Sequence, residues 1–152
     1  MKLVTIAEMR QIEKEADAAG WTYAQMMEQA GKGVADVVQA YYGYAENLFA
    51  IALVGTGNNG GDALIALAEL ANLGWRTAAY LASSRGESDS LVERVRETGG
   101  QIASVTADLD FRLLDSWLPE ATVLIDGVLG TGFQLPLRGE AARLMAHVRD
   151  SA

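Results

Sequence analysis

The fold is decided by LVGTGNNGGD, residues 53–62. An apolar run over 49–54 leads into this stretch, and an apolar helical pattern over 63–73 follows it. The stretch is therefore expected to be a loop that joins a buried strand to a helix. Its four glycines let the backbone turn tightly and approach a ligand closely. The free N–H groups at the start of the following helix favour anions such as phosphate.

Residues 55–60 match the dinucleotide pattern G-x-G-x-x-G in the required strand–turn–helix context. The usual acid near the end of the second strand is absent, because residues 80–83 read Tyr-Leu-Ala-Ser. The lysine of a P-loop is absent too, since Gly61 and Asp62 stand in its place. Asp62 has two interpretations, a helix cap or a functional carboxylate. Its position beside Asn58 and Asn59 favours the functional one.

The flanking sequence predicts an α/β fold. Two capping boxes, at 5–8 and 22–25, open helices that run to about residues 19 and 42. Predicted strands then alternate with predicted helices: strands at 48–54, 76–81, 101–105 and 121–125, helices at 63–73, 90–98, 109–118 and 140–148. This alternation predicts a three-layer α/β/α Rossmann-like fold, with a mostly parallel central sheet and helices on both faces. Two N-terminal helices precede its first strand.

In a doubly wound sheet of order 3-2-1-4, the first and fourth strands are neighbours. Asp126 closes the fourth strand, and a second glycine loop, residues 130–132, follows it. Both loops are then expected to border one crevice, at the carboxyl ends of the strands. Asp126 is either a site carboxylate or the start of a turn before Gly127. A carboxylate, an asparagine carbonyl and backbone carbonyls suit a hard cation, and a sparse shell of this kind suits a monovalent one.

Composition narrows the function. A chain of 152 residues, half of them hydrophobic, is expected to form one domain. The net charge of −8 argues against nucleic-acid binding. With no cysteine, disulfides, thiolate catalysis and cysteine-based zinc sites are excluded, and a reducing cytoplasm is compatible. Neither a signal peptide nor a membrane span is expected.

Several other side chains are predicted to have structural roles. His147, the single histidine, is expected to be a surface or packing residue. The charged run 93–97 is expected to be a solvated helix face. Core or packing roles are predicted for Met26, Met27, Trp21, Trp75 and Trp117.

Four segments together resemble a known family. They are VTIAEMR (4–10), MEQAG (27–31), GTGNNGGD (55–62) and DGVLGTGFQLPLRG (126–139). In this order they are similar to the YjeF N-terminal domain, the NAD(P)H-hydrate epimerase family. The resemblance covers nearly all of residues 1–152, and its Asn-Asn-Gly-Gly-Asp block is its most specific part.

The resemblance implies an isomerase that repairs damaged nicotinamide cofactors. Its substrates would be the R and S hydrates of NADH and NADPH (NADHX and NADPHX), interconverted at C6 of the nicotinamide ring. A potassium ion would be held by Asn59 and Asp126. Substrate contacts would come from two groups of residues: Asn58, Asn59, Gly60, Gly61 and Asp62 in the first loop, and Gly130, Thr131, Gly132, Phe133, Gln134, Leu135 and Pro136 in the second.

Two departures from the family pattern stand out. Ala63 replaces a glycine that usually follows the block. The chain ends at Ala152 without a further strand and a Val-Asp-x-Pro-Ser-Gly-like loop, so the domain is expected to lack its C-terminal strands. Bacterial relatives are often fused to an ADP-dependent NAD(P)H-hydrate dehydratase, and the N-terminal helices could pack a second subunit of a homodimer.

The chemistry requires an acid for the departing C6 hydroxyl and a base for the incoming water. Asp126 is the leading acid–base candidate, with Asp62 orienting the substrate or sharing the work. One alternative is a non-catalytic nucleotide-binding or dimerisation module of the same fold, like a relative that acts in an mRNA-decapping scaffold. The intact block and the acidic charge count against it.

Overall fold

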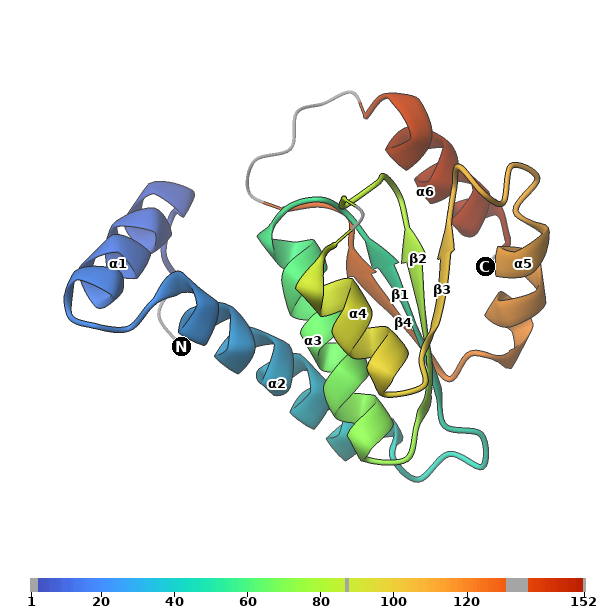
Figure 1. Ribbon diagram of the computed structural model, residues 1–152, viewed down its shortest axis with the longest axis horizontal. Coiled ribbons are helices and arrows are strands. Elements are labelled where there is room, and N and C mark those ends of the chain that lie inside the picture. The colour runs from blue at the N-terminus through green and yellow to red at the C-terminus, as the bar shows by residue number, and fades with distance from the viewer. Residues whose placement is uncertain (1–2, 87, 131–136, 152) are drawn as a thin grey trace.

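A computed structural model describes residues 3–86, 88–130 and 137–151. Figure 1 shows a central sheet between two layers of helices, with one further helix, α1, set apart. The elements in chain order are α1 (Ile6–Ala18), α2 (Tyr23–Tyr42), β1 (Phe49–Val54), α3 (Asn58–Asn72), β2 (Arg76–Leu81), α4 (Ser90–Glu97), β3 (Gln101–Ser104), α5 (Arg112–Trp117), the 3-10 turn η1 (Leu118–Glu120), β4 (Val123–Gly127) and α6 (Gly139–Ser151).

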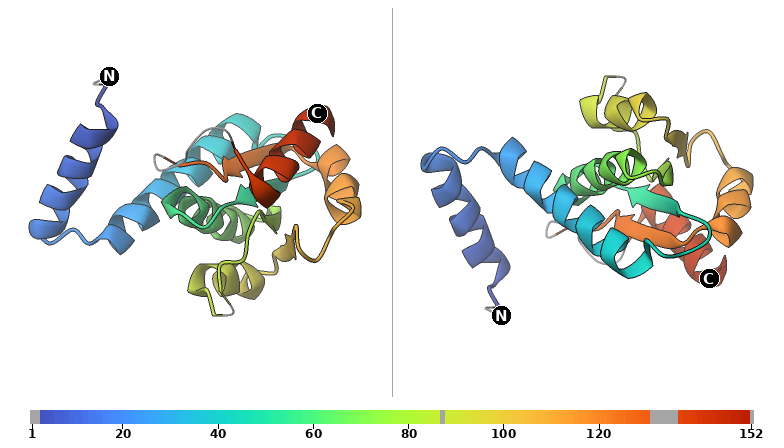
Figure 2. Two further views of the ribbon diagram at one scale, coloured as in Figure 1. Left: turned by 90° about the horizontal axis from the view of Figure 1, so that it is seen from above. Right: turned by 90° about the horizontal axis from the view of Figure 1, so that it is seen from below.

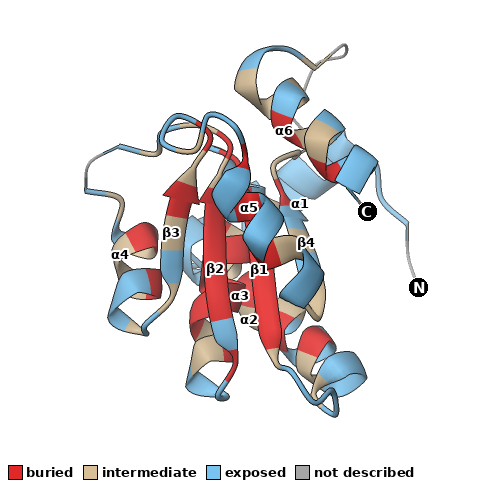
Figure 3. Ribbon diagram, turned by 90° about the vertical axis from the view of Figure 1, so that its right-hand side faces the viewer, coloured by how far each residue is buried: buried red, intermediate tan, exposed pale blue. Residues whose placement is uncertain are grey.

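The four strands are parallel, as predicted, and lie in the order β3-β2-β1-β4, which is the order assumed above. In the β1–β4 pair, Leu53 lies opposite Asp126 and Val54 opposite Gly127. Both strands therefore end at the same edge of the sheet. Every residue of β1 is buried, as Figure 3 shows.

Each face of the sheet carries its own core. Helices α2, α3 and α4 cover one face, and α5 and α6 cover the other (Figure 1). Successive side chains of a strand point to opposite faces. Ala50 and Ala52 of β1 thus belong to the first core, and Ile51 and Leu53 to the second.

Two predicted helix boundaries were wrong. Helix α3 begins at Asn58, not after Asp62, so the Asn-Asn-Gly-Gly-Asp block is the helix's first turn and not part of a loop. Helix α5 begins at Arg112, three residues later than expected. The Asp108 carboxylate accepts the N–H groups of Leu113 and Leu114 there, so it satisfies donors at the helix start from outside the helix.

The packing predictions had mixed outcomes. Trp75 and Trp117 are buried, but Trp21 is 55% exposed, because it lies at the α1–α2 corner beyond the layers that cover the sheet. His147 stacks on the Phe111 ring, with a centroid distance of 4.2 Å, which confirms a packing role. Met26 and Met27 are only partly buried, and neither is part of the two cores.

The charged run of α4 is not simply a solvated face. Arg94 donates to Glu28 of α2 at 2.8 and 3.0 Å and to Glu69 of α3 at 2.6 Å. Its side chain is 31% exposed. A single guanidinium therefore connects three helices, which the local charge pattern could not reveal.

Helix α1 stands away from the α/β body in both views of Figure 2. None of its residues is buried, and several of its apolar side chains are exposed: Ile6, Met9 and Ile12, preceded by Leu3 and Val4. No helix in the described part of the chain is long and apolar enough to cross a membrane.

Candidate functional site

A cleft of about 710 Å³ lies where the carboxyl ends of β1 and β4 meet the start of α3. Its lining comes from four parts of the chain: Ile6, Met9, Arg10 and Glu13 of α1, Tyr23, Met26, Met27 and Ala30 of α2, Thr56, Gly57, Asn58, Asn59 and Asp62 around the start of α3, and Val128 and Gly130 after β4. Ligands bind at such a strand edge in open α/β sheets. The volume is typical of small-molecule sites.

The first glycines allow the two strand ends to meet. The Gly55 N–H donates to the Gly127 carbonyl at 3.1 Å. A Cβ on Gly55 would lie 2.5 Å from the Val128 carbonyl oxygen, which is too close for any side chain. Gly57 then caps α3 without a side-chain acceptor. Among the described residues, no side chain caps the first N–H groups of α3, so these donors suit an anion.

Asn59 joins the two predicted loops. Its Nδ2 donates to the Leu129 carbonyl at 2.6 Å, across a sequence separation of 70 residues. Gly130 faces the same amide, since a Cβ there would lie 3.6 Å from Asn59 Cγ. The predicted meeting of the two segments at one crevice is confirmed for these residues. Thr131, Gly132, Phe133, Gln134, Leu135 and Pro136 lie outside the described residues.

Asp62 lines the cleft and is half-buried. It lies in the first turns of α3, five positions after the cap residue Gly57, so it is not the N-cap. Burial raises the pKa of the Asp62 carboxyl, and the nearby charge of Glu13 raises this pKa further. A carboxyl with a raised pKa holds its proton more readily, which suits a general acid.

The other predicted residues are placed differently. Asp126 is exposed at the end of β4, and its Oδ1 accepts the Val128 N–H at 2.9 Å. It is not among the residues that line the cleft. Gly60 and Gly61 are buried and do not line the cleft. A Cβ on Gly60 would clash with the Gly55 carbonyl, and a Cβ on Gly61 would clash with Met27 Sδ. Their role in the described structure is close packing of the helix start.

Sequence reasoning assigned no role to Arg10 and Glu13, which bring charge to the cleft from α1. Arg10 lies in a segment that matched the family, and this could have marked it. Arg85 was also missed, although it follows β2 where dinucleotide folds usually carry an acid. A basic residue shortly after the second predicted strand was the feature of the sequence that could have marked Arg85.

The side-chain oxygens of Asn59 and Asp126 are ligands of the kind that a monovalent cation takes. Within residues 3–86, 88–130 and 137–151, no group of three or more His, Cys, Asp or Glu side chains could share a metal ion. A multivalent ion usually needs such a charged group. Asn59 donates its Nδ2 to Leu129, its Oδ1 has no hydrogen-bond partner among the described residues, and Asp126 accepts the Val128 N–H with Oδ1 only.

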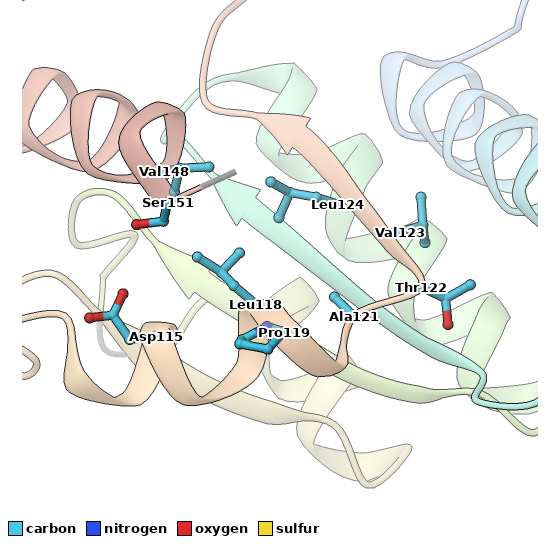
Figure 4. Close-up of a pocket in the computed structure, with 9 residues that line it drawn as sticks. All are labelled: Asp115, Leu118, Pro119, Ala121, Thr122, Val123, Leu124, Val148 and Ser151. Carbon is cyan, nitrogen blue, oxygen red and sulfur yellow. The ribbon is translucent and has the colours of Figure 1, made fainter.

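A second cavity, of about 390 Å³, lies at the opposite end of β4. Figure 4 shows its lining from α5, η1, the start of β4 and the end of α6, including Asp115, Leu118, Leu124 and Val148. None of the predicted site residues lines it. It lies at the amino end of a parallel strand, where this fold class does not place its ligands. The candidate site is therefore the cleft.

Comparison with known proteins agrees with this geometry. The family model described as YjeF-related protein N-terminus matches residues 23–152. An NAD(P)H-hydrate epimerase from Clavibacter sepedonicus is 36% identical over 142 residues, which are 92% of this chain and 58% of that protein. A bifunctional NAD(P)H-hydrate repair enzyme Nnr from Moorella thermoacetica is 29% identical over 140 residues, covering 88% of this chain and 26% of that protein.

The fold is similar to the crystal structure of the yeast protein ynu0, with a TM-score of 0.80 at 24% sequence identity. That match covers 99% of this chain and 64% of the yeast chain. The chain thus spans less than two thirds of each of these three proteins. The family model covers most of the chain, from α2 onward, including both segments that meet at the cleft, so the chain belongs to the YjeF N-terminal family.

Proposed function

We propose that the protein is an isomerase that interconverts the R and S hydrates of NADH and NADPH at C6 of the nicotinamide ring. One observation carries this proposal: Asn58, Asn59 and Asp62 face one cleft with the segment after β4. A pyrophosphate would be bound by the N–H groups at the start of α3. The nicotinamide end would then reach toward the carboxylate of Asp62.

The reaction needs two proton transfers. Nitrogen lone-pair donation expels the C6 hydroxyl once an acid protonates it, which leaves water and a planar iminium. Water then adds to the other face of C6 and loses a proton to a base, so atoms and charge balance overall. Asp62 is the proposed acid, because it lines the cleft and has a raised pKa. Asp126 remains the proposed base, at the exposed strand end next to β1 and outside the cleft lining, where it would reach a substrate that extends beyond the cleft.

A potassium ion held by Asn59 Oδ1 and Asp126 is part of the proposal. When bound, the ion would supply positive charge beside the substrate. Asp126 then has two candidate roles, base and ion ligand, which an experiment separates. If Asp126 is the base, Asp126→Asn lowers kcat at every potassium concentration. If Asp126 is a ligand, the variant raises the potassium concentration needed for half-maximal activity.

The direct test supplies purified R-NADHX and follows its conversion to S-NADHX by chiral chromatography, with and without potassium. Asp62→Asn is expected to lower kcat by about 100-fold or more, the usual contribution of a general acid. Asp36→Asn is the matched control, since Asp36 is an exposed carboxylate of α2 outside the cleft. If the wild-type protein gives no conversion, the proposed function is wrong.

Two further parts of the proposal concern partners. We propose a homodimer that uses α1, because its apolar side chains are exposed and Figure 2 shows it apart from the body. Light scattering of the wild type and of Ile12→Glu tests this, with a monomeric variant expected.

We also propose that the product S-hydrate passes to an ADP-dependent dehydratase, since relatives include bifunctional NAD(P)H-hydrate repair enzymes. The absence of cysteine fits a cytoplasmic location, which cell fractionation would test.

A further inference from the structure

Arg85 binds the backbone of the glycine segment before α3, residues 55–57, through its guanidinium. Its Nη1 donates to the Gly55 carbonyl at 2.5 Å and to the Gly57 carbonyl at 3.3 Å. Its Nε donates to Asp89 Oδ2 at 2.9 Å. Only 10% of the Arg85 side chain is exposed, so solvent weakens these charged hydrogen bonds little.

The guanidinium is itself held by a fixed partner. Asp89 caps α4, and its Oδ1 accepts the N–H groups of Leu91 and Val92 at 2.9 and 3.2 Å. The other carboxylate oxygen binds Arg85. The glycine segment is thereby connected to the start of α4 through two side chains.

Gly60 provides the space that this arrangement needs. A Cβ on Gly60 would clash with the Gly55 carbonyl oxygen and would lie 2.8 Å from Arg85 Nη1. Any side chain at position 60 would therefore displace the guanidinium or the loop. Gly60, which the family resemblance places among the substrate contacts, thus also leaves room for the Arg85 guanidinium beside the Gly55 carbonyl.

The contacts of Arg85 help to orient two backbone donors, through the Gly55 carbonyl and through the Gly57 carbonyl, which also accepts the Gly61 N–H of α3 at 3.3 Å. In a trans peptide the C=O and N–H groups point in opposite directions. With the Gly55 and Gly57 carbonyls turned toward Arg85, the N–H groups of Thr56 and Asn58 point away from it. Thr56 and Asn58 line the cleft, whereas Arg85 lines a separate cavity of about 180 Å³ on the other side.

We propose that Arg85 is a positioning residue that directs the Thr56 and Asn58 N–H groups toward the phosphates of a dinucleotide in the cleft. The inference rests on the proposed function only in taking the ligand to be a nicotinamide dinucleotide. Arg85 touches no substrate and moves no proton. Its loss should therefore weaken binding and leave the chemical step intact.

The test compares Arg85→Gln with Arg96→Gln. Arg96 lines the same small cavity, but its ion pair is with Glu93 on the surface and not with the loop. Arg85→Gln should raise the Kd for NADH, measured by calorimetry, and the KM for R-NADHX about tenfold, which corresponds to about 1.4 kcal/mol. Its kcat should stay within about twofold of the wild type, because only binding is lost. Arg96→Gln should change none of these values.

A second variant, Arg85→Lys, keeps the charge but removes the planar fork. A single ammonium cannot bind two carbonyls and Asp89 in the same geometry, so the Kd for NADH should again rise. Wild-type Kd values in both Arg85 variants, or an equal rise in Arg96→Gln, would overturn the inference. A wild type that binds NADH without epimerising it would overturn only the proposed function. A wild type that binds no NADH would overturn both.

Discussion

Gly31 allows α2 to cross α3 closely, and replacing it with alanine should destabilise the protein. A Cβ at position 31 would lie 2.5 Å from Ile65 Cβ and 2.8 Å from the Asp62 carbonyl oxygen. Both neighbours belong to α3, one as a helix backbone carbonyl and the other as a Cβ of a buried residue, so neither can move freely. Overpacking of this kind costs about 3 kcal/mol at the upper end of its usual range. Alanine regains about 1 kcal/mol of helix propensity, which leaves a net loss of about 2 kcal/mol.

Gly33 is the matched control, because it lies in the same helix and has nothing within 4 Å of its Cβ position. Gly33→Ala should therefore gain the propensity term alone, about 1 kcal/mol. The free energies of unfolding of the two variants should therefore differ by about 3 kcal/mol, which corresponds to a difference in Tm of about 6–12 °C at this chain length. Thermal unfolding followed by circular dichroism measures both. If Gly31→Ala is as stable as Gly33→Ala, then α2 and α3 do not pack as closely at Gly31 as the structure indicates. Gly31→Ala should also lower activity, since it presses on Asp62.

Two other predictions concern charge. Because burial raises the pKa of Asp62, the folded state loses stability as pH rises above the ordinary value of 3.8. Asp62→Asn should thus be more stable than the wild type at pH 7 and equally stable near pH 3, and urea midpoints that coincide at pH 7 would contradict this. Arg94→Met should cost about 1–2 kcal/mol at pH 7, since Arg94 bridges Glu28 and Glu69 with limited exposure. Arg94 lowers the pKa of Glu28, so this cost should be constant above pH 4.5 and should shrink as pH falls below 4.5 through the lowered pKa of the folded state. A cost that does not change at all with falling pH would contradict a role for the ion pairs.

The sequence predicted four parallel strands from patterns within the chain, and the pairing of two distant segments followed from an assumed strand order of 3-2-1-4. The apolar run of β1 predicts a central strand, and right-handed crossovers leave few ways to arrange four parallel strands. The pairing is seen in the bond from Asn59 to Leu129. The start of α3 was predicted wrongly, because glycines and asparagines usually indicate a loop. In the structure, α3 begins at Asn58 nonetheless, and tertiary contacts hold its glycine-rich first turn in place.

Side-chain roles in the site were harder to predict. Asp126 was the leading acid–base candidate, with Asp62 orienting the substrate or sharing the work, since the sequence carries no measure of burial. The structure places Asp62 in the cleft and Asp126 on an exposed strand end. The pKa of a carboxyl depends on its desolvation and on charges from other elements, here Glu13 of α1.

By itself, the sequence determined the layered α/β fold and the residues that mark the family, since these follow from periodicity and local motifs, whereas the order of the strands was an assumption that the structure bore out. Only the tertiary structure decided which carboxylate lies in the cleft, why Gly31 and Gly60 must be glycine, and how Arg85 binds the glycine segment. Each of these depends on contacts between elements that meet only after folding, such as Gly31 with Ile65, Gly60 with Arg85, and Arg85 with Gly55. Local patterns carry no information about such distances, because packing between elements sets them.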